Sequence, residues 1–271
     1  MKKYLHPTKL PLLTLGLGGL GLALRVWLFA SADENGLLKA GHPAITLVWL
    51  LAAVTLAGTF LLTRPLHGPG KYIHNFPRSL AAAVCCWAAA AAFFLRAMGT
   101  LLDSPDALGT VSGILGILAV PCLALTGLSR FKGQRTSFLF HTVICLAFTG
   151  QILGQYRVWS ASPALQHYCF QMLSTVGLML TAYHRAEFDA RFGKRRAYAF
   201  VALSTLFFCL LAIPEGDSGL FYLIMAAWVF TNLCSMRPAR RRPKPAAPKE
   251  PAADGAAPEV NAAEEPRQEE L

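Results

Sequence analysis

The chain has 271 residues, of which 54% are hydrophobic and only 15% are charged. A soluble domain carries about 25% charged residues, so this composition argues against a water-soluble protein. The net charge of +10 would suit a nucleic-acid-binding protein. However, the Lys and Arg residues flank long apolar runs, and no basic segment with interleaved aromatic residues is present. We therefore expect no nucleic-acid partner, and we expect the positive charge to face anionic lipids in the cytoplasmic leaflet.

Eight continuous apolar runs follow one another along the chain. A transmembrane helix needs about 20 apolar residues, whereas strands of a membrane barrel need only about 10 and alternate in polarity. The sequence therefore predicts an all-α, polytopic transmembrane helix bundle in residues 1–236. Its eight predicted spans are Leu10–Ala30, Ala44–Thr63, Ser79–Leu102, Ala107–Leu128, Phe138–Trp159, Ala164–Tyr183, Ala197–Ile213 and Gly219–Met236.

The segments between these runs alternate between basic and almost free of Lys and Arg. Cytoplasmic loops are enriched in Lys and Arg, so the alternation predicts that both termini are cytoplasmic. A bacterial-type plasma membrane fits this pattern. The basic segments include Lys2, Lys3 and Lys9, then Arg64, Lys71 and Arg78, then Arg130, Lys132 and Arg135, then the stretch 185–196. The intervening loops instead hold Asp33, Glu34, Asp103, Asp106, Glu215 and Asp217.

The start of the chain allows a second interpretation. Lys2 and Lys3 precede an apolar run that ends in Ala30-Ser31-Ala32, which is the outline of a cleavable secretory signal peptide. Cleavage would leave seven spans with an external N-terminus. Because Arg25 interrupts the run and the run is long for such a signal, we favour an uncleaved first span.

Residues 237–271 differ from the rest of the chain. They begin with basic residues and continue with Ala, Pro and Glu, and they lack apolar side chains to bury, so we expect a disordered cytoplasmic tail. Its basic half is expected to bind anionic lipid headgroups, at about 1 kcal/mol per charge, and a role in binding a partner protein stays open. The basic residues are Arg237, Arg240, Arg241, Arg242 and Lys244.

No metal or cofactor is predicted. All seven Cys residues fall inside predicted spans, and none belongs to a Cys-x-x-Cys pair. Buried Cys usually behaves as a small hydrophobic residue, so neither a disulfide framework nor a zinc site is indicated.

One polar layer lies below the predicted outer surface. Charged residues within a membrane are costly and indicate function by default. The simplest interpretation is that each Arg reaches the interface and pairs with Asp33, Glu34, Asp103 or Asp106. Because a guanidinium binds carboxylate or phosphate in bidentate fashion, a second interpretation is an outward-facing site for a small anionic or zwitterionic solute. Contact with a partner protein or a lipid headgroup is a third. The candidate ligand-binding residues are Arg25, Arg96, Gln151, Gln155, His167 and Gln171.

The motifs of the major enzyme classes are missing from the sequence. There is no Gly-x-Ser-x-Gly, His-Glu-x-x-His or Walker loop, so we expect a protein that is not an enzyme. No Asp or Glu falls inside a predicted span, which argues against ordinary proton coupling. The favoured function is binding or transport of a small anionic or zwitterionic solute. The alternative is a non-catalytic scaffold, sensor or accessory subunit of a larger complex.

Overall fold

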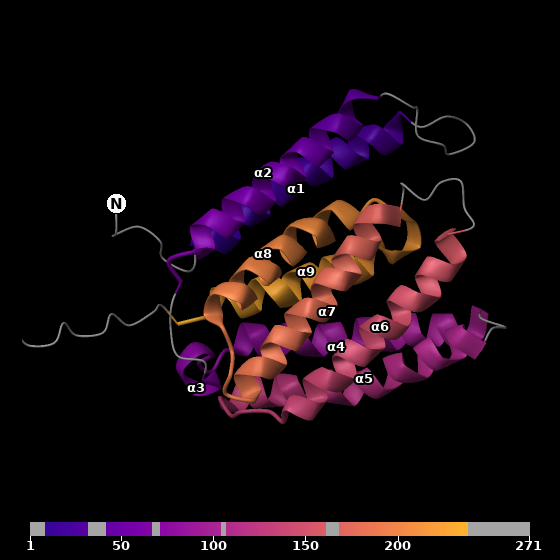
Figure 1. Cartoon of the computed structure of the whole chain (residues 1–271). Helices are drawn as coiled ribbons and strands as arrows, with labels where there is room; N and C mark the ends of the chain where they lie inside the picture. Colours follow the sequence, from indigo (N-terminus) through magenta and orange to yellow (C-terminus); the bar gives the residue numbers. More distant parts are fainter. Residues whose placement is uncertain (1–8, 32–41, 67–70, 104–106, 161–167, 238–271) are drawn as a thin grey trace, which may run out of the picture. The chain divides into compact units, whose positions relative to one another are not determined.

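The computed structural model describes residues 9–31, 42–66, 71–103, 107–160 and 168–237. Within these ranges the chain is helical and contains no strand, so the predicted helical bundle is confirmed. The elements are α1 (Lys9–Ala30), α2 (Pro43–Thr63), α3 (Tyr72–Asn75), α4 (Leu80–Asp103), α5 (Ala107–Lys132), α6 (Phe138–Ser160), α7 (Cys169–Asp189), α8 (Arg195–Ala212), η2 (Gly216–Ser218) and α9 (Gly219–Cys234) (Figure 1).

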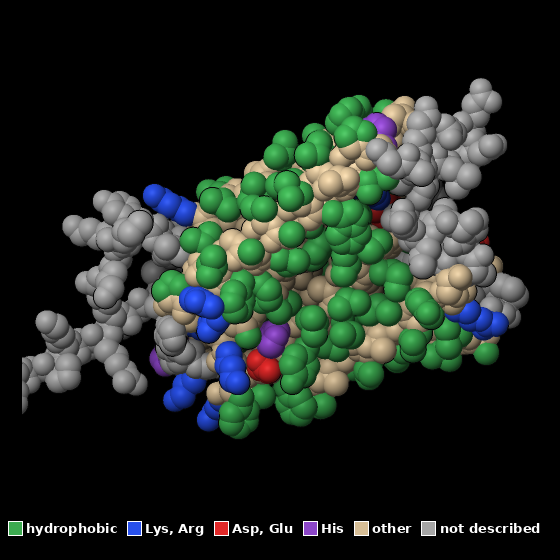
Figure 2. All heavy atoms as spheres, turned by 45° about the horizontal axis from the view of Figure 1, so that its top comes forward, with side chains coloured by type: hydrophobic (Ala, Val, Ile, Leu, Met, Phe, Trp, Pro, Cys, Tyr) green, Lys and Arg blue, Asp and Glu red, His purple; other side chains and the backbone are tan. Residues whose placement is uncertain are grey.

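Six of the described helices are long and apolar enough to cross a membrane. These are α1, α2, α4, α5, α8 and residues Phe138–Arg157 of α6. Helix α9 is apolar but has only 16 residues, and the last two turns of α7 carry Arg185, Glu187 and Asp189. On the face shown in Figure 2, hydrophobic side chains cover the middle and most Lys and Arg side chains gather at one end. The chain is therefore an integral, multi-pass membrane protein.

Six helices form a closed ring in the order α4, α5, α6, α7, α8, α9, in which each packs against the next and α9 packs against α4. The α1–α2 pair packs on α8 from outside this ring (Figure 1). Helix α8 is thus covered on both sides: 78% of an 18-residue stretch of it is buried, against 22% for α2. Inside the ring, the Phe93 ring packs edge-on against Phe148 at 5.0 Å and Phe221 at 5.5 Å.

Glycine allows the closest helix contacts in this bundle. A Cβ atom at Gly113 of α5 would lie 2.5 Å from Leu101 Cγ of α4, and one at Gly116 would lie 2.8 Å from Ala97 Cβ. A larger residue at either position would force the facing side chain or the helix to shift. The α4–α5 pair, the most extensive helix contact of the described chain, therefore depends on small residues, as expected for membrane helices.

The two ends of the bundle differ in charge. At the end that we call the basic end lie α3 and the connections α5–α6 and α7–α8, together with Lys71, Arg130 and Arg195 (Figure 1). The α8–α9 connection, with Glu215 and the 3-10 turn η2, lies at the opposite end. The polar side chains described below are grouped at these two ends.

Candidate functional site

At the opposite end, two of the six predicted ligand-binding residues come together around Glu215. The Arg25 guanidinium of α1 donates to Glu215 Oε1, and both side chains are buried. The backbone N–H of Gln171 donates to Glu215 Oε2 at 3.2 Å, and the Gln171 side-chain amide donates to the Glu215 carbonyl. Arg25 also lies 4.8 Å from the centre of the Phe170 ring. The Arg25 guanidinium is therefore occupied by a side chain of the protein itself.

Arg96 of α4 uses a different partner in the same connection. Its Nη1 donates to Ser218 Oγ at 2.9 Å, and its guanidinium lies 4.7 Å from the centre of the Phe221 ring. Arg25 and Arg96 thus hold two points of one short connection, Glu215 and Ser218, rather than one shared ligand. Nothing in their contacts requires a solute.

The other predicted ligand-binding residues that the structure describes form no hydrogen bond with Glu215 or Ser218. Gln151 is buried, and the side-chain carbonyl oxygens of Gln151 and Gln155 have no hydrogen-bond partner within the described chain. His167 lies outside the described residues. Of the four acids expected to pair with the outer arginines, Asp33, Glu34 and Asp106 also lie outside them, and Asp103 is exposed at the end of α4. The acid that does pair with Arg25 is Glu215, from a connection far away in sequence.

Burial changes the acid–base behaviour of Glu215. Desolvation raises the pKa of this carboxyl from 4.5 to about 8. The Arg25 guanidinium and the Gln171 N–H oppose the rise, because both favour the ionised carboxylate, but they offset only part of it. The Glu215 carboxyl therefore takes up its proton at a higher pH than an exposed glutamate does.

A second polar cluster lies inside the ring at the basic end. Phe76, directly after α3, is buried, and two guanidinium groups lie over its ring: that of Arg130 at 5.2 Å and that of Arg185 at 3.9 Å from the ring centre. Both arginines are also buried, with 0% and 3% of their surface exposed. Two like charges are thus held in the protein interior against one aromatic ring. Cation–π attraction offsets part of the cost of burying them, by about 1–2 kcal/mol per cation.

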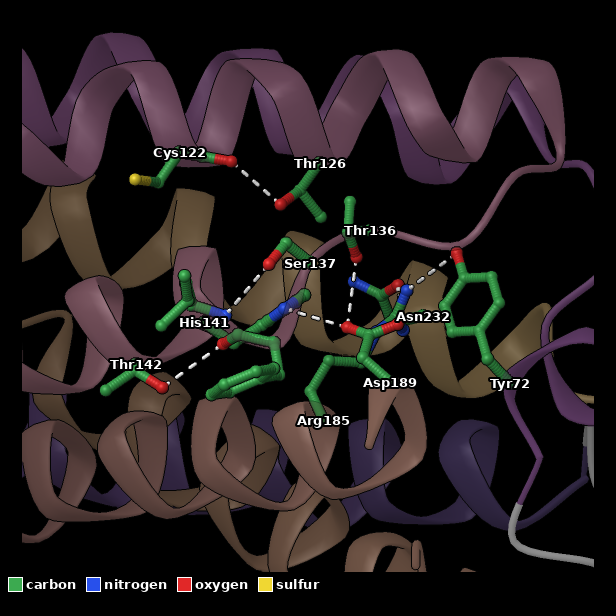
Figure 3. Close-up of polar contacts among 12 residues, drawn as sticks. Tyr72, Cys122, Thr126, Thr136, Ser137, His141, Thr142, Arg185, Asp189 and Asn232 are labelled. Carbon is green, nitrogen blue, oxygen red and sulfur yellow. Dashed lines mark hydrogen bonds and ion pairs between the residues drawn. The ribbon is translucent and has the colours of Figure 1, made fainter. Parts of the chain in front are cut away.

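The hydrogen bonds of these two arginines all go to neutral groups. Arg185 donates to Asn232 Oδ1 at 3.1 Å and to the Tyr72 hydroxyl at 3.4 Å (Figure 3). Arg130 donates to the Pro77 carbonyl at 3.2 Å and to Ser235 Oγ. The Nε–H group of each arginine has no acceptor among the described residues. Both guanidiniums are therefore hydrogen-bonded, yet their charge is not paired with an anion.

One carboxylate lies close to this cluster, and it is engaged elsewhere. Asp189 Oδ2 lies 3.0 Å from His141 Nδ1 of α6 and accepts a hydrogen bond from the Thr136 hydroxyl, also at 3.0 Å (Figure 3). Asp189 and His141 are both buried. Asp189 lies outside the predicted span Ala164–Tyr183, but helix α7 continues past Tyr183 to Asp189 and buries this acid.

The longer α7 explains why the sequence did not reveal the cluster. Arg130 and Arg185 fall just beyond the apolar runs that define the predicted spans, so the sequence places both in cytoplasmic connections. In the structure both belong to helices, and their side chains turn inward. A signal was nevertheless present: Thr181, Arg185 and Asp189 follow one another at four-residue spacing, which places them on one buried face of α7.

The charge balance of the cluster determines its chemistry. Two guanidiniums and one carboxylate leave one positive charge in excess when His141 is neutral. A buried charge without a counter-ion costs several kcal/mol, and a small monoanion would remove that cost and would accept hydrogen bonds from the free Nε–H groups. Within the described ranges, no three His, Cys, Asp or Glu side chains are grouped as metal ligands would be.

Comparison of the chain with protein-family models, curated proteins and solved structures gives no significant match.

Proposed function

We propose that this chain is an eight-span protein of a bacterial-type plasma membrane, with both termini cytoplasmic, that binds a small anion at the Arg130–Arg185 cluster. The six apolar helices together with α7 and α9 supply eight crossings. The alternation of basic and acidic connections supports this orientation by the positive-inside rule, which makes the basic end the cytoplasmic one.

The observation that carries the proposal is the pair of buried guanidiniums over the Phe76 ring. Their terminal nitrogens have only neutral acceptors, and the nearby carboxylate is held by His141 and Thr136. In a membrane protein such uncompensated intramembrane charge marks a functional site by default. The predicted site around Arg25 is less suited to binding a solute, because the Arg25 guanidinium already donates to Glu215.

The ligand class follows from the donors. Two guanidiniums and the hydroxyl group of Tyr72 suit a single carboxylate or phosphate group, since an Arg fork binds these planar or tetrahedral oxyanions in bidentate fashion. His141 and Asp189 beside the cluster are of the residue types that carry protons in transporters. We therefore favour proton-linked binding or transport of a small monoanion over a purely structural role.

The proposal is tested by thermal unfolding of the purified protein in detergent, with acetate or phosphate replacing chloride at constant ionic strength. We expect saturable stabilisation, which reaches about 2.7 kcal/mol at 100 times the dissociation constant. Arg185→Gln should abolish it. Arg130→Lys, which keeps the charge but lacks the planar fork, should weaken it while preserving the fold.

The matched control is Arg135→Gln, because Arg135 lies at the same end but is exposed. This variant removes the same charge and should leave the anion response unchanged. An equal, non-saturable effect of every salt on the wild type and all variants would contradict the proposal. That outcome would favour the alternative function, a scaffold, sensor or accessory subunit.

A further inference from the structure

A groove opens on the side of the bundle between α4 and the start of α9. Its volume is about 820 Å³. On the α4 side it is lined partly by small residues, and a Cβ atom added at Gly99 would meet no atom within 4 Å. The lining residues are Ala88, Ala91, Ala92, Leu95, Arg96, Gly99, Thr100 and Asp103 of α4, with Ser218, Leu220, Phe221 and Ile224.

The groove is apolar along one part and polar at the other. The turns of α4 nearer the middle of the helix contribute Ala88, Ala91 and Leu95, which face away from the ring and are exposed. The polar lining residues follow in the last turns of α4 and in η2. A groove with an apolar stretch and one polar end matches the shape of a lipid, with acyl chains along the apolar stretch and a headgroup at the polar end.

Arg96 is positioned to bind an anion in this groove. Its hydrogen bond to Ser218 and its contact with the Phe221 ring fix the guanidinium, and the half-buried side chain lines the groove. No described carboxylate lies within ion-pair distance of it. An arginine held by one hydroxyl and one ring keeps further N–H donors for a phosphate group.

Asp103 gives the groove a second charge, and the two charges follow a defined order along α4. It follows Arg96 by seven residues, so it lies about 10 Å further along the axis of α4, toward the opposite end. It is exposed, and the described chain offers it no cationic partner. The cation therefore lies nearer the acyl region and the anion nearer the aqueous surface. A phospholipid with an amine headgroup has the complementary order, because its phosphate lies inside its ammonium group.

We propose that the α4–α9 groove binds a zwitterionic phospholipid with a primary ammonium headgroup, of the phosphatidylethanolamine class. Arg96 binds the phosphate, Asp103 accepts hydrogen bonds from the ammonium group, and an acyl chain lies along Ala88, Ala91 and Leu95. This site is at the opposite end of the bundle from the Arg130–Arg185 cluster. Its test is thus independent of the anion-binding proposal.

The experiment is native mass spectrometry of the purified full-length protein, in detergent with equimolar dioleoyl phosphatidylethanolamine and dioleoyl phosphatidylglycerol. The wild type should retain phosphatidylethanolamine in preference. Arg96→Gln should lower retention of both lipids about tenfold, which corresponds to one charge-assisted contact. Asp103→Asn should remove the preference between the two lipids without removing binding, because only the ammonium contact is lost.

Gly99→Leu provides a variant that fills the groove without touching either charge. Because Leu favours helix over Gly and the position is open, this variant should fold and should retain neither lipid. Glu187→Gln removes a carboxylate near the basic end and should behave as the wild type. Equal retention of both lipids by the wild type and Arg96→Gln would overturn the proposal. A second outcome would also overturn it. If the wild type is a dimer, and Gly99→Leu dissociates the dimer but leaves the amount of bound lipid unchanged, the groove is a self-association surface.

Discussion

Arg185 and Asp189 lie one helical turn apart on α7, yet they do not form an ion pair. The Arg185 guanidinium donates to Asn232 and Tyr72, whereas the Asp189 carboxylate lies against His141 and Thr136. Charges at this spacing on a helix commonly attract each other. Their separation leaves the Arg185 guanidinium without a direct ion pair among the described residues. The two guanidiniums and the single carboxylate keep one positive charge in excess, and in our proposal this excess makes the basic end a binding site.

Asp189→Asn should increase the dependence of the protein on anions. Removing the carboxylate raises the positive charge of the cluster by one and leaves His141 without its partner. We expect a loss of about 3–5 kcal/mol in the free energy of unfolding without added anion, and a larger stabilisation by phosphate than in the wild type. Chemical or thermal unfolding with and without phosphate measures both quantities.

Glu187→Gln is the matched control for Asp189→Asn. Glu187 is on the same helix, but it pairs with His184 at 2.9 Å outside the cluster. If both variants respond to phosphate alike, the charge balance of the cluster is not the cause.

Phe76→Leu should destabilise the protein more than Phe93→Leu. Both phenylalanines are buried in the ring and contact other aromatic rings, but guanidiniums lie over only the first. The difference between the two variants isolates the cation–π contribution, which we expect to be about 1–2 kcal/mol. Equal losses in unfolding free energy would show that Phe76 acts through packing alone.

The Arg25–Glu215 pair predicts a pH effect on stability. The folded-state pKa of Glu215 is raised to about 8, above its ordinary value of 4.5. The folded protein therefore holds this proton more tightly than the unfolded chain. The resulting stability is complete below about pH 4.5 and is lost as the pH rises through about 8. Unfolding temperatures measured from pH 5 to pH 9 should fall more steeply for the wild type than for Glu215→Gln, which cannot titrate. Parallel curves for the two proteins would exclude this linkage.

Gly113→Val should weaken the α4–α5 contact. The added side chain would collide with Leu101, and overpacking of this kind costs about 1–3 kcal/mol. Gly154→Val is the control for the change in residue type, because a Cβ atom at Gly154 would meet nothing within 4 Å. The unfolding free energies of the two variants should differ by that amount; no difference would mean that the two helices can move apart freely.

Local composition was sufficient to predict the class of protein. The apolar runs predicted the helices to within a few residues for α1, α2 and α4, since a helix in a bilayer requires a continuous apolar segment of fixed length. The alternation of basic loops likewise predicted which connections share an end, because neighbouring helices joined by short loops must run in opposite directions. The ends of α7 were less accurate, because its last turns are polar and are buried by protein rather than by lipid.

The pairing of polar side chains was decided by the tertiary structure alone. Arg25 meets a glutamate 190 residues away because α1 packs on α8, which leads into Glu215. Arg130 and Arg185 meet at Phe76 because the ring of helices closes and Phe76, directly after α3, lies between them. Sequence spacing reports neighbours on one helix, whereas these contacts depend on which helix faces which. The sequence therefore identified which polar residues are costly to bury, and only the packing of the ring determined their partners.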